Sequence, residues 1–183
     1  MLSFKAKYIS PVNIEKKTDS GHFKKYQVSL VELDPVDSRD LNCVKKTSLS
    51  WEKGNSLAED IAISMQDEFI NGRTSEMSKY YAITTQVDDL KNLVAKKILG
   101  LAGVLTTEDK NVDYIDIIQI SPNYTKENKN RKYRYIGKTL LNAIKNLAPN
   151  KDLILEAREA AVGFYQKNGF KLINDYGFMI FKR

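Results

Sequence analysis

E-A-R-E-A-A-V-G-F-Y-Q-K-N-G-F, residues 156–170, is the stretch that decides the fold. It follows a short apolar run at 153–155 and ends with Gly169-Phe170. An apolar run that leads into helical periodicity and stops at a glycine predicts a strand, then a helix of about three turns. Apolar residues recur at helical spacing through Ala161 and Tyr165, so one face of this helix is apolar and carries a tyrosine hydroxyl.

A second unit lies upstream of this stretch. The run Tyr114–Ile120 predicts a strand, and a basic segment, Arg131–Lys138 (R-K-Y-R-Y-I-G-K), leads into a predicted helix at Tyr135–Leu147. A strand, a basic loop and a helix N-terminus form a geometry that holds a pyrophosphate, because amides and cations face the anion together. Taken alone, Gly137 in this loop is better explained as a glycine at a helix start.

The two units together resemble the GCN5-related N-acetyltransferase superfamily over residues 97–183. The second signature of that superfamily is an alanine, a tyrosine four residues later, and then G-F. Ala161, Tyr165 and Gly169-Phe170 match it.

The superfamily's acyl-CoA loop, R/Q-x-x-G-x-G/A, is matched only in part. Lys132 stands at the Arg/Gln position, Tyr135 replaces the first glycine, and Gly137 fits the second. Arg158 occupies a position where many members have asparagine. These departures concern the contacts to the pyrophosphate and leave the order of elements unchanged.

The resemblance implies an α/β fold with one domain over residues 1–183. Its mixed central sheet would have about six or seven strands, with helices on both faces and central parallel strands that splay apart. Residues 1–50 would form variable N-terminal strands, and residues 97–183 would form the cofactor-binding half.

Periodicity elsewhere extends this order of elements. Strands are predicted at 4–14, 26–33, 79–86, 97–106, 171–174 and 178–182, and helices at 38–44, 56–70, 88–96 and 159–168. Ser56 and Glu59 have the spacing of a capping box for the helix at 56–70.

The resemblance implies acetyl-CoA as the cofactor. Free backbone groups at 118–120 would pair with the pantetheine arm as an added strand does. The amides of 132–137 and the following helix start would face the pyrophosphate. The residues assigned to the cofactor are Ile118, Gln119, Ile120, Lys132, Tyr133, Arg134, Tyr135, Ile136, Gly137, Lys138, Thr139, Arg158, Ala161 and Phe164.

Tyr165 is the candidate catalytic residue, because the resemblance places a tyrosine here near the thioester sulfur, where it acts as a general acid. Packing on an amphipathic helix is the alternative role. Asp116, in an apolar strand, and Glu156, at a strand end, are candidate general bases. Glu108 and Asp113 flank the preceding turn as further candidates, and an ordinary surface carboxylate is the alternative for each.

The acceptor implied by the resemblance is a primary amine of a small molecule, a protein or a peptide. The superfamily's acceptor site lies between the early helices and the central strands. We therefore assign Trp51, Tyr80 and Tyr81 to it, with core packing as the alternative role of each.

Composition excludes several other classes of protein. One cysteine and one histidine in 183 residues leave no metal site of the Cys-cluster or His-rich kind. No apolar run approaches the roughly 18 residues of a membrane helix, and the N-terminus lacks a signal-peptide pattern. We expect a cytoplasmic monomer, or a homodimer paired through an edge strand near the C-terminus.

A non-catalytic RNA-binding or protein-interaction module on the same scaffold is the second hypothesis. The formal net charge is +6, and Lys126–Lys138 holds six basic residues against one acid. Interleaved tyrosines at 124, 133 and 135 could grip RNA by stacking. Nucleic acid is therefore the second choice of partner.

Overall fold

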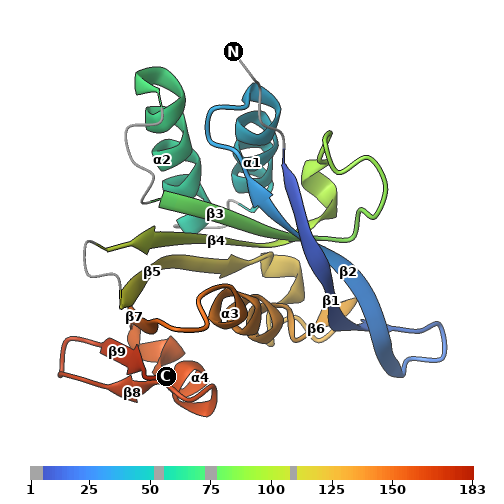
Figure 1. Ribbon diagram of the computed structural model, residues 1–183. Helices are drawn as coiled ribbons and strands as arrows, with labels where there is room; N and C mark the ends of the chain where they lie inside the picture. The colour runs from blue at the N-terminus through green and yellow to red at the C-terminus, as the bar shows by residue number, and fades with distance from the viewer. Residues whose placement is uncertain (1–5, 52–55, 73–77, 108–110) are drawn as a thin grey trace.

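Strands from the whole length of the chain join one sheet in the order β6-β1-β2-β3-β4-β5-β7-β9-β8 (Figure 1). The computed structural model describes residues 6–51, 56–72, 78–107 and 111–183. The strands are β1 (Lys7–Lys17), β2 (Phe23–Leu33), β3 (Ser78–Thr84), β4 (Ile98–Thr106), β5 (Val112–Ile120), β6 (Tyr133–Arg134), β7 (Asp152–Glu156), β8 (Lys171–Leu172) and β9 (Phe178–Phe181). Neighbouring strands are antiparallel except β5 and β7, which are parallel.

The sheet is larger than the expected six or seven strands, since nine strands lie within the described residues. No strand was predicted at the two-residue β6, whereas β8 lies within the strand predicted at 171–174. β6 pairs with β1, through Lys16 and Tyr133, and this partner is far away in sequence. A strand of two residues is also too short to show an alternating pattern, so no local sequence signal indicates β6.

Helices cover both faces of the sheet, as expected (Figure 1). The helices α1 (Ser38–Trp51) and α2 (Leu57–Asn71) lie on one face, α3 (Ile136–Leu147) lies on the other, and α4 (Glu159–Lys167) lies beside the C-terminal strands. In the described part of the chain, no helix has both the length and the apolar character needed to cross a membrane.

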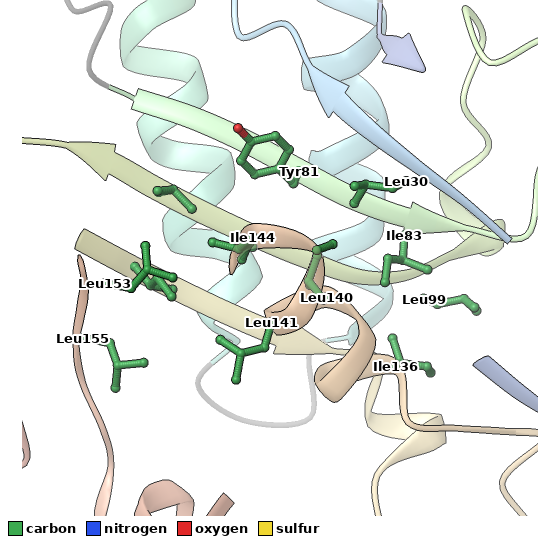
Figure 2. Close-up of a cluster of buried hydrophobic side chains, with 14 of the residues drawn as sticks. Leu30, Tyr81, Ile83, Leu99, Ile136, Leu140, Leu141, Ile144, Leu153 and Leu155 are labelled. Carbon is green, nitrogen blue, oxygen red and sulfur yellow. The ribbon is translucent and has the colours of Figure 1, made fainter. Parts of the chain in front are cut away.

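Alternation along the strands produces two cores, one on each face. In β3, Tyr81 and Ile83 belong to the core under α3, whereas Tyr80 and Ala82 belong to the core under α1 and α2. Successive strand side chains point to opposite faces, so one apolar run serves both cores. Figure 2 shows the core under α3, where leucine and isoleucine side chains of the helix gather with those of the strands.

The start of α2 corrects one expectation. Ser56 is the residue before the helix, but its side chain makes no capping hydrogen bond, so the capping box with Glu59 is wrong. Instead the side-chain oxygen Oε1 of Gln119 in β5 accepts a bond from the Ala58 N–H at 2.5 Å and one from the Ser56 hydroxyl at 3.4 Å. A residue of the sheet thus satisfies a free amide of the helix.

Two helix predictions in the N-terminal half need revision. The helix expected at 38–44 continues to Trp51. The helix expected at 88–96 is absent from that segment, which contains only the start of a 3-10 turn at Ala95–Lys97. Asp89 has a φ of 48°, which a helix cannot include, and the Gln86 side-chain amide donates to the Asp89 and Asn92 carbonyls. The first residues of the strand predicted at 4–14 lie outside the described residues.

Candidate functional site

β5 has an open edge at the centre of the sheet. It pairs with β4 as far as Ile120, but its parallel pairing with β7 ends at Ile115 and Leu155. The edge of β5 from 116 to 120 therefore has no strand partner on the β7 side among the described residues. This is the expected splay, and an open strand edge can pair with an extended, amide-rich ligand.

A β-bulge at Asp116 marks the point where the two strands separate. Gly103 of β4 pairs with Ile117 and Val104 pairs with Ile115, so Asp116 is the extra residue on β5. Bulges bend a strand and redirect a side chain, and they are over-represented beside active sites. Asp116 therefore lies at the point where β5 and β7 part.

The N-terminus of α3 lies at the far end of this open edge. A Cβ atom at Gly137 would lie 3.6 Å from Cγ2 of Ile120 in β5 and 3.7 Å from Cζ of Phe164 in α4. The absent side chain thus points between β5 and α4, and both distances are ordinary van der Waals contacts. Three elements, β5, α3 and α4, meet at this glycine.

Tyr135 precedes α3 in a left-handed conformation, with φ 65° and ψ 13°. Its position is that of the first glycine in the resembled loop pattern, and glycine adopts this conformation most easily. The chain therefore has a backbone conformation typical of glycine at this position, although the residue is a tyrosine. The ring is 57% exposed, so it does not fill the core.

The amides of 136–138 precede the first helical hydrogen bond, which runs from the Thr139 N–H to the Tyr135 carbonyl at 2.8 Å. Helix-start amides of this kind are free to bind an anion. Lys132 and Lys138, on either side of this helix start in the sequence, are exposed, and the Lys132 ammonium lies 5.7 Å from the ring centroid of Tyr133. This part of the predicted anion site is brought together.

Other predicted cofactor residues are engaged elsewhere. Tyr133 is buried between the rings of Tyr26 and Tyr124, and its backbone pairs with β1. The guanidinium of Arg134 lies 3.6 Å from the ring centroid of Phe23. These contacts engage the side chains of Tyr133 and Arg134 and part of the backbone of β6, and the contact of the other amides of 132–137 with a ligand stays a prediction.

Side chains of three further predicted residues point away from an anion. The Thr139 hydroxyl donates to the Asn13 carbonyl of β1 at 2.8 Å, and the Ile136 side chain is only 1% exposed. The Gln119 side chain caps α2. Any contact of Ile136 or Gln119 with a ligand is thus left to the backbone.

Tyr165 lies on α4 beside Phe164, in the helix that approaches Gly137. Its ring makes edge contacts with Phe164 at 5.1 Å and Phe170 at 5.7 Å between centroids. Burial raises the pKa of the Tyr165 hydroxyl, so it keeps its proton at neutral pH. In the same helix, Arg158 is the exposed N-cap residue, and its carbonyl accepts a bond from the Ala161 N–H at 2.7 Å.

The candidate bases differ in their surroundings. Partial burial, and then the negative charge of Asp60, raise the pKa of Asp116. Asp116 and Glu156 are both exposed, Glu156 at the end of β7, and Asp113 forms an ion pair with Lys151 at 2.7 Å. Glu108 lies outside the described residues. Asp116 on the bulge and Glu156 at the end of β7 therefore both stay candidate bases.

A cavity of 310 Å³ lies between α2 and the strands β3, β4 and β5. Asp116 lines it, together with Asp67 and Glu68 of α2 and Tyr80 of β3. The Tyr80 hydroxyl donates to Oε1 of Glu68 at 2.8 Å. Burial, followed by the Glu68 carboxylate, raises the pKa of Tyr80.

Only one of the three residues predicted for the acceptor lines this cavity. Trp51 packs in the core under α1 and α2, and Tyr81 packs in the core under α3, where Figure 2 shows it. Neither residue lines this cavity, which favours the core-packing alternative for both. The sequence analysis missed Glu68. The available signal was its helical spacing from Ile61 and Met65, which places a carboxylate on the buried stripe of α2.

No protein-family model matches this sequence, and no curated protein matches it. Solved structures do match the fold. An acetyltransferase-type structure of the GNAT family from Desulfovibrio desulfuricans shares 16% identity at a TM-score of 0.55, over 83% of this chain and 96% of that one. The PaiA N-acetyltransferase of Thermoplasma acidophilum in complex with coenzyme A shares 16% identity at a TM-score of 0.52, over 83% and 97% of the two chains. AtaT complexed with acetyl-methionyl-tRNAfMet shares 14% identity at a TM-score of 0.53, over 84% and 94%.

Proposed function

We propose that this chain, which has the fold of the GCN5-related N-acetyltransferases, transfers an acetyl group from acetyl-CoA to a primary amine. One observation carries the proposal: the open edge of β5, the N-terminus of α3 and Tyr165-bearing α4 meet around Gly137. One similar structure is a coenzyme A complex. A fold alone does not determine an activity, so the argument rests on this site.

The residues present fit acetyl-CoA. The edge at 116–120, which has no strand partner on the β7 side among the described residues, offers backbone groups to the pantetheine amides. The helix-start amides at 136–138 and the exposed Lys132 and Lys138 offer hydrogen bonds and charge to the pyrophosphate. Gly137 has no side chain to cover the helix start, so the backbone there can come close to a bound phosphate.

The reaction needs a general acid and a general base, and we assign these roles to Tyr165 and Asp116. Acetyl-CoA provides an activated thioester; the amine nitrogen bonds to the acetyl carbon while the carbon–sulfur bond breaks. Starting from an ammonium group, two protons leave the nitrogen, and one proton is needed by the sulfur. Tyr165 keeps its proton at neutral pH and donates it to the leaving sulfur as a general acid. Asp116, on the bulge, accepts one of the two protons from the nitrogen, directly or through water, and later releases it to the solvent. The second proton returns through water to the Tyr165 oxygen after the sulfur has left, so one proton is released in total.

Glu156 remains the second candidate base. It terminates β7 on the other side of the splay and is exposed. Asp116 is preferred because it also lines the cavity under α2, where an acceptor has room. A small-molecule amine and a protein or peptide amine are both compatible with this arrangement.

Thermal-shift titration with acetyl-CoA and with CoA tests the proposal. Ligand that binds only the folded state raises the melting temperature in a concentration-dependent way. Gly137→Asp places bulk and negative charge at the phosphate site, and we expect affinity to fall by at least about a hundredfold.

Gly137→Ala is the matched control for folding, because the added Cβ meets only ordinary contacts. It should fold as well as the wild type and weaken CoA binding less than the aspartate does. Absence of any shift with the wild-type protein, or an unchanged shift in Gly137→Asp, would contradict the proposal.

RNA binding is the second candidate function, and one observation favours it. Lys16, Lys17, Lys24 and Lys25 surround a hollow of 280 Å³ at the tip of the β1–β2 hairpin, next to β6 of the basic loop. Such a basic surface suits phosphates. Salt-dependent binding of a single-stranded RNA by a protein that shows no shift with CoA would favour this second function.

A further inference from the structure

The cavity between α2 and β3–β5 is acidic in a protein whose formal net charge is +6. Three carboxylates line it, those of Asp67, Glu68 and Asp116, and none of the described residues that line it is basic. Asp60 of α2 adds a fourth negative charge that acts on Asp116. The composition of the chain would favour the opposite sign, so this concentration of acids is local.

Glu68 gives the cavity an unsatisfied buried group. Its side chain is 7% exposed, and one carboxylate oxygen accepts the Tyr80 hydroxyl. The other oxygen, Oε2, is buried and has no hydrogen-bond partner among the described residues. A buried carboxylate oxygen without a partner is costly, and a cation that donates a hydrogen bond removes that cost.

The rest of the lining suits an aliphatic chain. Ile61, Val104 and Ile117 contribute apolar surface between the acids. Seven helical positions separate Ile61 from Glu68, so the part of α2 that borders the cavity extends about 10 Å. Asp116 faces this cavity from the bulge where β5 parts from β7, so the cavity and the proposed cofactor groove meet at one residue.

We propose that this cavity is the acceptor site and that the acceptor is a linear diamine or polyamine. Glu68, assisted by Asp67, holds an ammonium group that is not acetylated, and the apolar wall contacts the methylene chain. Asp116 receives the nitrogen that attacks the thioester and accepts its proton. This inference rests on the proposed acetyltransferase function, but the binding of the amine can be measured without it.

Isothermal titration calorimetry of the whole chain with putrescine, and with butylamine as the matched monoamine, tests the inference. Both probes have the same carbon chain, and only putrescine has the second ammonium. We expect putrescine to bind at least about tenfold more tightly than butylamine, since a charge-assisted hydrogen bond is the difference between them. Added salt should reduce this preference.

Glu68→Gln is the decisive variant, and Glu59→Gln is its control. Both changes remove one negative charge from α2, but Glu59 is exposed and does not line the cavity. Glutamine keeps an oxygen that can accept the Tyr80 hydroxyl. The preference for putrescine should disappear in Glu68→Gln and persist in Glu59→Gln. If Glu68→Gln does not fold, Asp116→Asn takes its place, and weaker putrescine binding is expected.

The outcomes separate the two proposals. Equal affinities for the two amines, or an unchanged preference for putrescine in Glu68→Gln, would overturn this inference. In that case a thermal shift with acetyl-CoA would still support the proposed acetyltransferase function. Putrescine binding that depends on Glu68 in a protein without a shift with acetyl-CoA supports a cation site and overturns the acetyltransferase. With both signals present, acetyl transfer to putrescine should exceed that to butylamine in kcat/KM, and an equal kcat/KM contradicts the inference.

Discussion

The helices on the two faces of the sheet bury different kinds of residue. α3 buries five apolar side chains and one lysine, whereas α1 and α2 bury Asp40, Thr47, Ser48 and Glu68 beside their apolar residues. α3 therefore gains its position from packing, which also places its N-terminal amides and Gly137 beside β5. The buried ionisable groups of the two faces differ in kind: Lys145 on α3 is a base, whereas Asp40 and Glu68 on α1 and α2 are acids. Buried acids are costly for stability and suited to a ligand of opposite charge.

The difference suggests that the face under α3 holds the cofactor and that the face under α1 and α2 selects the acceptor. A cofactor shared by many enzymes can be held by backbone groups and a helix start, which packing positions. An acceptor that must be selected needs side chains with specific charge and shape. The variants below test whether the two faces really differ in this way, and they run from the largest expected effect to the smallest.

Leu140→Ala should destabilise the protein most. Leu140 is 0% exposed at the centre of the α3 core, where Figure 2 shows it among the strand side chains. Removal of a buried leucine side chain leaves a cavity and costs about 3 kcal/mol of unfolding free energy. Urea denaturation measures the loss. Leu49→Ala is the control, because Leu49 is 62% exposed on α1, and a similar loss there would contradict the packing argument.

Tyr165→Phe should reduce turnover by about a hundredfold, or about 2.7 kcal/mol, because it removes the general acid. The ring keeps its contacts with Phe164 and Phe170, so stability and CoA affinity should change little. Steady-state rates and a CoA titration of the same sample separate the two effects. Unchanged kcat would leave Tyr165 with a packing role only.

The C-terminal half was the more predictable half, because its signals are local. The strand at 97–106 and the helices at 135–147 and 159–168 agree with the structure to within a residue or two at each end. An apolar run marks the strand, helical periodicity marks the two helices, and Gly169 follows the second helix. The residues of the candidate site in this half, including Tyr165 and Gly137, lie on the expected elements, and their roles remain predictions.

The features that sequence could not predict depend on contacts between distant residues. The side chain of Gln119 caps α2 by accepting a bond from Ala58, which lies 61 residues earlier in the sequence. β6 exists only because β1 lies beside it. The acidic cavity requires α2, β3 and β5 to converge, and nothing in the local pattern around Glu68 or Asp116 places them on one wall.

Asp40→Asn should remove a pH dependence of stability that comes from the α1 side. Burial, together with the charges of Asp37 and Asp34, raises the pKa of Asp40 from 3.8 to about 7 in the folded protein. The hydrogen bond that its carboxylate accepts from the Asp34 N–H lowers the pKa, but by less than burial raises it. Between about pH 4 and pH 7 the folded state holds this proton and the unfolded state does not, so the unfolding free energy falls as pH rises.

The expected loss across this window is on the order of 2 kcal/mol, since relaxation reduces the effect of the full shift. Asparagine can still accept the Asp34 N–H and does not titrate. Urea denaturation at several pH values should therefore show a shallower slope for Asp40→Asn, and greater stability than the wild type above pH 7. Asp88→Asn, at an exposed position, is the control. Parallel pH profiles for Asp40→Asn and the wild type would place the titrating group elsewhere.

Tyr135→Gly should have the smallest effect, and its sign is informative. The left-handed φ of 65° costs a tyrosine about 1 kcal/mol relative to glycine, and the ring is 57% exposed, so little packing is lost. The added freedom of glycine in the unfolded chain offsets part of the gain. We expect unchanged or slightly higher stability, by at most about 1 kcal/mol, with CoA affinity retained.

Tyr176→Gly is the matched control. Tyr176 is 83% exposed and is not among the described non-glycine residues with positive φ, so glycine there should only destabilise. If Tyr135→Gly destabilises as much as Tyr176→Gly, the left-handed start of α3 is wrong. If it abolishes CoA binding, the exposed ring of Tyr135 is itself part of the cofactor site, and packing and backbone would not suffice to hold the cofactor on this face.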